Sequence, residues 1–192
     1  MSARRPMARV LLPWLVAAVA GAVYVAFAVA QWRALETPSW DLGIFTQLAQ
    51  AYAHGAAPIV DIKGVGTHLL GDHWHPLLVV LGPVYRLWPS GLTLLVVQGA
   101  LFAASAVPLT AVAIERLGRG LGTVLGLAYA LSWGLAAAVA AQFHEIAFAV
   151  PLLALSLAAF LRGRWWACAA WAMPLGLVKE ALGPTVAALA GA

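Results

Sequence analysis

The chain alternates between long apolar runs and short polar segments. The first apolar run covers residues 10–30, and further runs lie around residues 76–88, 90–114, 121–141, 146–161 and 165–178. A helix needs about 20 largely apolar residues to cross a bilayer. The pattern therefore predicts an all-α fold, a polytopic bundle of transmembrane helices with about five full spans.

The first apolar run also resembles a secretory signal peptide. Basic residues precede it, and Ala28-Val29-Ala30 has the small residues of a cleavage site. The core of a signal peptide holds about 7 to 15 apolar residues, and this run is longer. We therefore favour an uncleaved first span at residues 10–30, followed by an outer loop at residues 31–75 and a helix bundle at residues 76–192.

Two of the apolar segments are too short to cross a bilayer comfortably. Residues 76–88 contain Pro83 and precede Pro89, so we interpret this segment as a short helix that lies at the membrane edge or partly enters it. The last segment, residues 181–192, resembles the first half of another span. The sequence thus predicts a single transmembrane domain over residues 1–192, truncated at its C-terminus.

Composition supports a membrane protein over a soluble one. Hydrophobic residues make up 64% of the chain and charged residues only 9%, whereas soluble domains carry about 25% charged residues. The net charge of +4 is not arranged as a basic stripe with interleaved aromatic residues, so we predict no nucleic-acid partner. The single cysteine, Cys168, has no partner for a disulfide bond or a cysteine metal cluster.

The charged residues indicate a topology. We place the N-terminus in the cytoplasm and treat residues 76–88 as non-crossing, which predicts a multi-pass protein of the cell membrane. This arrangement puts seven of the eleven basic residues inside, as membrane proteins prefer: Arg4, Arg5, Arg9, Arg116, Arg119, Arg162 and Arg164. It puts outside six acidic residues and all five histidines: Glu36, Asp41, Asp61, Asp72, Glu145, Glu180, His54, His68, His73, His75 and His144.

The outer loop opens with Asp41, which precedes apolar residues at helical spacing. Leu42, Phe45, Leu48 and Tyr52 predict a short amphipathic helix that ends near residue 55. An aspartate in this place is either the N-cap of the helix or a catalytic carboxylate. Position alone does not separate the two interpretations.

A second cluster lies at the end of the outer loop. His73 and His75 alternate as on a strand, with Asp72 beside them. Imidazole and carboxylate groups together suit zinc or another divalent metal ion. The alternative is that these are solvated loop residues, because a His-x-His pair lacks the full ligand set of a metal site.

Two further polar clusters interrupt the bundle. His144 and Glu145 lie between two apolar runs, and Lys179 and Glu180 lie between two others. Ionisable groups near membrane depth usually face a polar cavity or a partner. The alternatives are an ordinary interfacial loop for the first pair and side chains that reach to the interface for the second. Motifs typical of soluble enzymes, such as a phosphate-binding glycine loop or a nucleophile elbow, do not occur.

The order of these motifs resembles a family of bacterial polytopic membrane proteins of unknown function. That family is related to the GT-C superfamily of glycosyltransferases, which use lipid-linked sugars. The residues that carry the resemblance, between about Trp40 and Glu180, are Asp41-Leu42-Gly43-Ile44-Phe45-Thr46-Gln47, His54-Gly55, His73-Trp74-His75-Pro76, Pro83-Val84-Tyr85, Gln98, Phe143-His144-Glu145 and Lys179-Glu180. Ala181 differs from relatives that often carry an acidic residue there.

The resemblance implies transfer of a sugar, with inversion, from a polyprenyl-phosphate carrier at the outer membrane face. Asp41 matches the carboxylate that acts as general base or metal ligand in such enzymes. Lys179, Glu180, His144 and Gln47 are the candidates for binding the substrate or its phosphate. A divalent metal ion held by Asp72, His73, His75 or Glu145 is a further candidate for balancing the phosphate charge.

Two other function classes fit the same residues. In a transporter, the residues of the third and fourth clusters would line a path near the middle of the membrane. In a scaffold without chemistry, the loop residues would contact a partner. Inverted repeats and broken helices at the midplane would favour transport, and the sequence shows neither.

Overall fold

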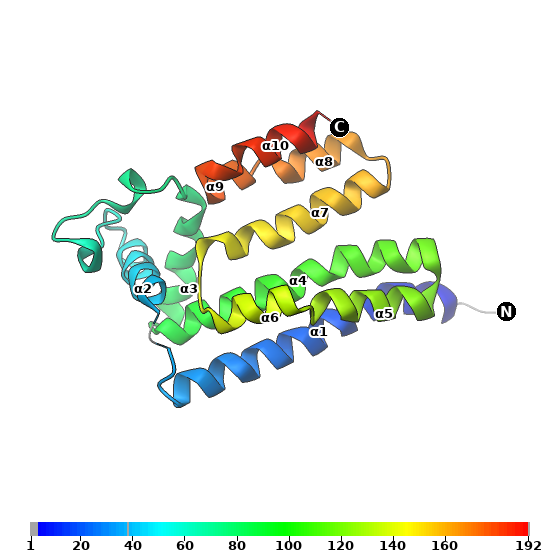
Figure 1. The fold of residues 1–192 in the computed structure, drawn as a ribbon, viewed down its shortest axis with the longest axis horizontal. Coiled ribbons are helices and arrows are strands. Elements are labelled where there is room, and N and C mark those ends of the chain that lie inside the picture. The colour runs from blue at the N-terminus through cyan, green and yellow to red at the C-terminus, as the bar shows by residue number, and fades with distance from the viewer. Residues whose placement is uncertain (1–3, 38, 192) are drawn as a thin grey trace.

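The computed structural model describes residues 4–37 and 39–191 of the chain. It consists of helices joined by loops and short 3₁₀ turns, and the described residues form no strand (Figure 1). The helices are α1 (Arg4–Arg33), α2 (Trp40–Ala53), α3 (Leu81–Leu87), α4 (Gly91–Leu117), α5 (Arg119–Ala130), α6 (Trp133–Ala140), α7 (Ala149–Leu161), α8 (Trp165–Ala172), α9 (Leu175–Val178) and α10 (Gly183–Ala190). The predicted all-α fold is confirmed.

The described residues contain three helical segments that are long and apolar enough to cross a membrane. These segments are Val10–Arg33, Gly91–Leu117 and Arg119–Ala140. Pro76–Leu87, Glu145–Leu161 and Trp165–Val178 are apolar but shorter. The helical membrane protein predicted from the sequence agrees with these segments, while the count of five full spans stays a prediction.

Helix α4 lies at the centre of the bundle and packs against α1, α5 and α7. Its hairpin partner α5 approaches so closely that a Cβ atom added at Gly126 would overlap the side chain of Thr110. Only glycine allows this approach. One face of α1 exposes large apolar side chains: Trp14, Leu15, Val19, Val23 and Phe27. In a membrane protein such a face contacts the lipid bilayer.

The apolar run predicted at residues 121–141 forms two helices in line. Helix α5 ends at Ala130 and α6 begins at Trp133. The break frees the carbonyl group of Ala130 from the helical pattern, and the buried hydroxyl of Tyr24 on α1 donates a hydrogen bond to it. A polar group from a neighbouring helix thus satisfies the backbone where the helix is interrupted. The sequence predicted no broken helix, and the structure corrects this for the candidate span Arg119–Ala140.

The two ends of the bundle differ in what they carry (Figure 1). The start of α1, the α4–α5 turn and the α7–α8 turn share one end, and the turns carry Arg116, Arg119, Arg162 and Arg164. At the other end, α2 and α3 lie across the ends of the long helices, next to the α6–α7 connection and α9. The structure therefore separates the basic turns from the histidine-rich segments. Which end faces the cytoplasm stays a prediction.

Candidate functional site

Helix α2 carries Asp41 in its first turn, but Asp41 is not its cap. The N-cap is Ser39, whose side-chain oxygen accepts a hydrogen bond from the backbone N–H of Leu42 at 3.4 Å. The interpretation of Asp41 as the helix cap is therefore wrong, because serine two residues earlier already supplies the oxygen that the helix start needs. Leu42, Phe45 and Leu48 are buried as the helical spacing predicted.

The side chain of Asp41 is available for other contacts. It is 49% exposed, and its Oδ2 lies 3.7 Å from Nε2 of His144. This distance is too long for a hydrogen bond. No described residue donates a hydrogen bond to the Asp41 carboxylate, so both of its oxygen atoms remain open to a ligand.

Glu145 is the most buried charged group of the site, with only 2% of its side chain exposed. Lys179 Nζ donates a hydrogen bond to its Oε1 at 2.7 Å. His144 Nδ1 lies 2.5 Å from its Oε2, although no hydrogen bond of ordinary geometry joins these two atoms. Burial alone would raise the pKa of Glu145, but the close His144 and Lys179 side chains bring that pKa down to about 2. Glu145 is therefore a carboxylate at neutral pH.

Contact with Glu145 also acts on the neighbouring imidazole. It raises the pKa of His144 above its ordinary value, against the opposing effect of partial burial. The backbone of His144 is extended and precedes a 3₁₀ turn at Glu145–Phe148. This conformation turns the imidazole Nε2 toward Asp41 on α2, so that Asp41, His144, Glu145 and Lys179 form a continuous chain of charged and polar groups.

His73 and His75, at the end of the outer loop, differ in burial and in contacts. His73 is about half exposed, and its Nδ1 lies 2.9 Å from Oε1 of Glu180, while the N–H of Trp74 donates to Oε2 at 2.9 Å. His75 is 2% exposed and packs edge-on against Phe45, with ring centroids 6.0 Å apart. Burial lowers the pKa of His75, so this imidazole is neutral at neutral pH. Its Nδ1 has no hydrogen-bond partner in the described part of the chain.

These side chains surround a cavity of about 120 Å³. Its lining is Asp41, Ile44, Phe45, Lys63, Leu69, Asp72, His73, His75, His144, Glu145 and Lys179. We call it the polar cavity. Its volume is that of about four water molecules in the liquid, so it accommodates one polar end of a ligand and leaves the rest outside.

The polar cavity unites most of the residues predicted to carry chemistry. Asp41, Asp72, His73, His75, His144, Glu145 and Lys179 line it, and Glu180 joins it through His73. Gln47 does not, because it lies on another face of α2, where its Oε1 accepts a hydrogen bond from the N–H of Ile62 at 3.0 Å. Lys63, which pairs with Asp72, was not predicted, since nothing in its sequence neighbourhood indicates this contact.

Three of the four predicted metal ligands contact other side chains. Among the residues that the structure describes, no group of three or more His, Cys, Asp or Glu side chains is placed to hold one. The predicted ligands are engaged elsewhere: Asp72 with Lys63, His73 with Glu180, and Glu145 with Lys179. The divalent metal ion stays a prediction.

Two glutamines hold the polar cavity in place. Gln98, buried in α4, donates to the carbonyl oxygens of Ala138 at 3.0 Å and Gln142 at 2.9 Å, and accepts from the N–H of His144 at 3.0 Å. Gln142 in turn accepts from the N–H of Ser39 at 3.1 Å. It also donates to the carbonyl oxygen of residue 36 at 2.9 Å. The first glutamine therefore fixes the segment of His144, and the second fixes the start of α2.

Gln142 adopts a left-handed backbone conformation, with φ of 74°. Such a conformation is uncommon for a residue other than glycine and costs about 1 kcal/mol or more. The hydrogen bonds of both glutamines offset this cost. The signal for Gln98 in the sequence is an amide side chain inside an apolar run, which points to a polar partner, but not to which one.

Comparison with known proteins identifies a family but no activity. No curated protein and no solved structure matches the chain. Residues 31–191 match the model of a family described as predicted membrane protein (DUF2079). The match includes every residue of the polar cavity and agrees with the resemblance to a membrane protein family of unknown function. The match extends over most of the length of the chain, and the chain therefore belongs to this family of predicted membrane proteins.

Proposed function

We propose that this protein is a GT-C-like glycosyltransferase that moves a sugar from a polyprenyl-phosphate carrier to an acceptor hydroxyl at the outer membrane face. The observation that supports this most is that the Asp41 carboxylate is accessible and accepts no hydrogen bond from the part of the chain that the structure describes. It lines the polar cavity, its side chain is half exposed, and its oxygens accept no hydrogen bond from the described residues. The other carboxylates of the site each lie within hydrogen-bond distance of a lysine or histidine nitrogen, whereas the His144 nitrogen is 3.7 Å from Asp41.

In this proposal Asp41 is the general base. The acceptor hydroxyl gives its proton to the Asp41 carboxylate while its oxygen forms a bond to the anomeric carbon of the sugar. The bond between that carbon and the carrier phosphate oxygen breaks at the same time, and polyprenyl phosphate leaves with the electron pair. His144 Nε2, 3.7 Å from Asp41, is placed to orient the carboxylate or to share its proton.

Lys179 is the group proposed to meet the carrier phosphate. Its ammonium group has three donor hydrogens, and the contact with Glu145 at 2.7 Å uses one of them. The remaining donors are available to phosphate oxygens at the cavity. Glu145 keeps Lys179 charged and fixed, because its own pKa of about 2 leaves it ionised at neutral pH. Positioned charges of this kind stabilise negative charge that develops on a leaving group.

The depth of the site favours surface chemistry over transport. Asp41 lies beyond the end of α1 at Arg33, and His144 lies beyond the end of α6 at Ala140. The polar cavity is therefore at the ends of the candidate spans. A transport path would place its ionisable groups near the middle of the spans.

The direct test uses membranes that contain the full-length protein. Polyprenyl-phosphate glucose and polyprenyl-phosphate mannose, each with a labelled sugar, are supplied as probes, and the label that leaves the carrier is measured. Asp41→Asn removes the base but keeps its shape, and we expect a loss of about 10²- to 10⁴-fold in rate.

Glu36→Gln is the matched control. It removes an exposed carboxylate of the same loop whose side chain is outside the polar cavity, and we expect no change in rate. A folded Asp41→Asn protein that transfers sugar as fast as the wild type contradicts the proposal.

A further inference from the structure

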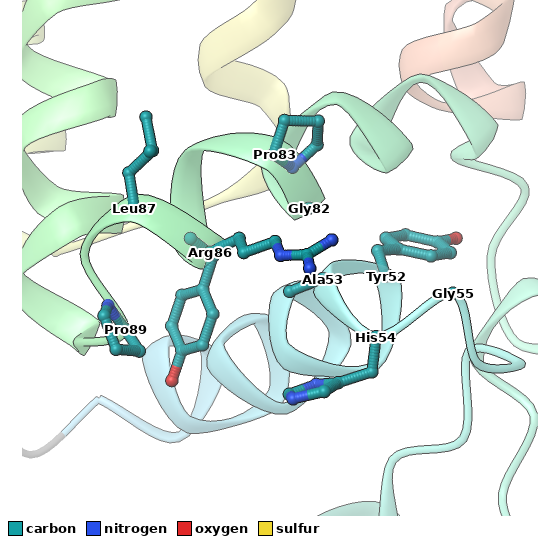
Figure 2. Close-up of a pocket in the computed structure, with 10 residues that line it drawn as sticks. Tyr52, Ala53, His54, Gly55, Gly82, Pro83, Arg86, Leu87 and Pro89 are labelled. Carbon is teal, nitrogen blue, oxygen red and sulfur yellow. The ribbon is translucent and has the colours of Figure 1, made fainter.

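A second cavity, larger than the polar cavity, is separate from it. It is a groove of about 1010 Å³ between the end of α2 and α3 (Figure 2). Its lining is Tyr52, Ala53, His54, Gly55, Gly82, Pro83, Tyr85, Arg86, Leu87 and Pro89. The two cavities share no residue. They lie toward opposite ends of α2, whose residues Asp41 and Ala53 are about 18 Å apart by the rise of the helix.

Two motifs from the sequence analysis meet in this groove. Residues 54–55 and residues 83–85 both carry the resemblance described above, and the polar cavity uses neither. A close contact between α2 and α3 brings them together, since a Cβ atom added at Gly82 would lie 2.9 Å from the backbone of Tyr52. A glycine at this position therefore lets α3 lie directly on the end of α2, with the groove beside the contact.

The groove is positively charged. Its lining contains Arg86 but no aspartate or glutamate. The imidazole of His54, which also lines the groove, contacts the carbonyl oxygen of Gln50 at 2.8 Å. The guanidinium group of Arg86 is exposed and makes no ion pair with any described residue. Figure 2 shows Arg86 reaching from α3 across the groove toward Ala53 and Tyr52. An unpaired arginine within a concave site fits an anion, and arginine favours phosphate groups in particular.

The end of α2 does not already use Arg86 as a cap. The carbonyl oxygens of Gln50, Ala51 and Tyr52 accept hydrogen bonds from the N–H groups of residues 54–56. The helix end is thus closed by its own backbone. Arg86 is left without a structural partner in the described residues.

The groove lies next to the start of a candidate span. Arg86 precedes the first residue of α4, Gly91, by five positions, and the residues between them include two strongly exposed apolar side chains. Leu87 is 71% exposed and Trp88 is 68% exposed. Exposed tryptophan beside the end of a span is typical of the headgroup layer of a membrane. Pro83 and Leu87 add apolar surface to the lining of the groove.

We propose that the groove binds the headgroup phosphate of an anionic membrane lipid, with Arg86 as its principal contact. The phosphate lies against the guanidinium group, and the glycerol and upper acyl region lie along Pro83 and Leu87. The volume suits this ligand, because ligand sites in proteins are commonly about 300 to 1,000 Å³. The proposal does not depend on the glycosyl transfer proposed above, and its test needs no activity.

The test uses the purified full-length protein in detergent. Phosphatidylglycerol or phosphatidylcholine is added in equal amounts, and the lipid molecules that stay bound are counted by native mass spectrometry. We expect tighter retention of phosphatidylglycerol, and we expect Arg86→Gln to weaken it by about tenfold, the loss of one charged hydrogen bond. Ala53→Phe, which fills the groove and leaves Arg86 in place, should weaken it as well.

Arg119→Gln is the matched control, because Arg119 is an exposed arginine beside a span at the opposite end of the bundle. Retention by this variant should equal that of the wild type. The proposal is overturned if Arg86→Gln and Arg119→Gln retain phosphatidylglycerol equally, or if phosphatidylcholine binds as tightly. It is also overturned if inorganic phosphate alone displaces the lipid at low concentration, because the site would then be one for free phosphate.

Discussion

Each end of the bundle holds an ion pair between a glutamate and a basic side chain that is distant in the sequence. At the end with the polar cavity, Lys179 Nζ lies 2.7 Å from Oε1 of Glu145, whose side chain is 2% exposed. At the other end, Arg162 donates two hydrogen bonds to Glu115 at 2.9 and 2.7 Å, and the Glu115 side chain is 49% exposed. The contacts are similar in length but differ in burial.

This difference in burial distinguishes the ion pair of the polar cavity from an ordinary surface ion pair. Glu115 and Arg162 join the α4–α5 and α7–α8 turns in an exposed region where water screens their charges, so their pairing contributes little to stability. Glu145 carries its charge inside the protein, which costs free energy unless well-placed basic partners compensate for the lost hydration. Such an arrangement is more typical of a functional site, because buried charge is rarely retained for stability alone.

Replacing the basic residue of each ion pair should give the largest difference in stability between the two ends. Lys179→Met leaves Glu145 buried without its lysine, and we expect the free energy of unfolding to fall by about 3 kcal/mol. The estimate is at the low end because Lys179 itself keeps 24% of its side chain exposed. Arg162→Gln should cost about 1 kcal/mol or less. Unfolding by denaturant in detergent micelles measures both.

A double substitution sharpens this contrast. Glu145→Leu together with Lys179→Met removes both charges, and most of the lost stability should return. If the double variant is as unstable as Lys179→Met, the instability comes from lost packing rather than from an unpaired carboxylate.

The next effect concerns the glutamine that holds the polar cavity in place. Gln98→Leu leaves the N–H of His144 and the carbonyl oxygen of Ala138 without this partner, and we expect a loss of about 2 kcal/mol. Ser105→Ala is the control on the same helix, since its hydroxyl contacts the carbonyl oxygen of Phe102 and the hydroxyl of Tyr129, and neither residue lines the polar cavity.

The same variant tests whether Gln98 positions the site. Spin labels at residues 41 and 144 should report a broader range of distances in Gln98→Leu than in Ser105→Ala. Equal distributions would show that Gln98 contributes to stability without positioning His144.

The contrast between the ends also explains what the sequence could predict. Apolar runs and helical spacing predicted the helices, including the buried face of α2. Burial against lipid or in the core requires apolar residues at regular spacing, and this spacing is visible in the local sequence. The positions of arginines and histidines along the chain also predicted that the basic turns and the histidine-rich segments lie at different ends of the bundle. The meeting of Asp41, His75, His144 and Lys179 followed from placing four clusters on one side.

Contacts between distant segments were not predictable in detail. Ser39 rather than Asp41 caps α2, and nothing in the local pattern decides between two residues that both favour this position. Gln47 lies away from the polar cavity and Lys63 lies within it because of how the outer loop folds onto α2. The groove at Arg86 likewise exists only once α3 packs on α2.

A smaller effect is expected from pH. The pKa of Glu145 is about 2 in the folded protein, below its ordinary value of 4.5. A depressed pKa means that the ionised group stabilises the fold above the unfolded pKa, and that this contribution is lost as pH falls from about 4.5 toward 2. The wild type should therefore lose thermal stability in this window more steeply than Glu145→Gln.

Glu180 provides the exposed counterpart in the same measurement. Its pKa is also lowered to about 2, through contact with His73, but water surrounds its side chain. Glu180→Gln should change the pH dependence less than Glu145→Gln does. Parallel pH profiles for the wild type and Glu145→Gln would show that the buried pair is not ionised in the fold.

The most direct test of the account is which side of the membrane carries the polar cavity. Single cysteines are placed at Asp41, His73, His144 and Glu180 of the full-length protein. These side chains are between 44% and 49% exposed, and buried Cys168 is replaced by alanine. Intact cells are then treated with a thiol reagent that does not cross membranes, with a cysteine at Arg119 as the control. Labelling of the four positions and not of the control is the predicted result. Labelling divided between the two sides would contradict a single outer site, and with it the proposed transfer from a lipid-linked sugar.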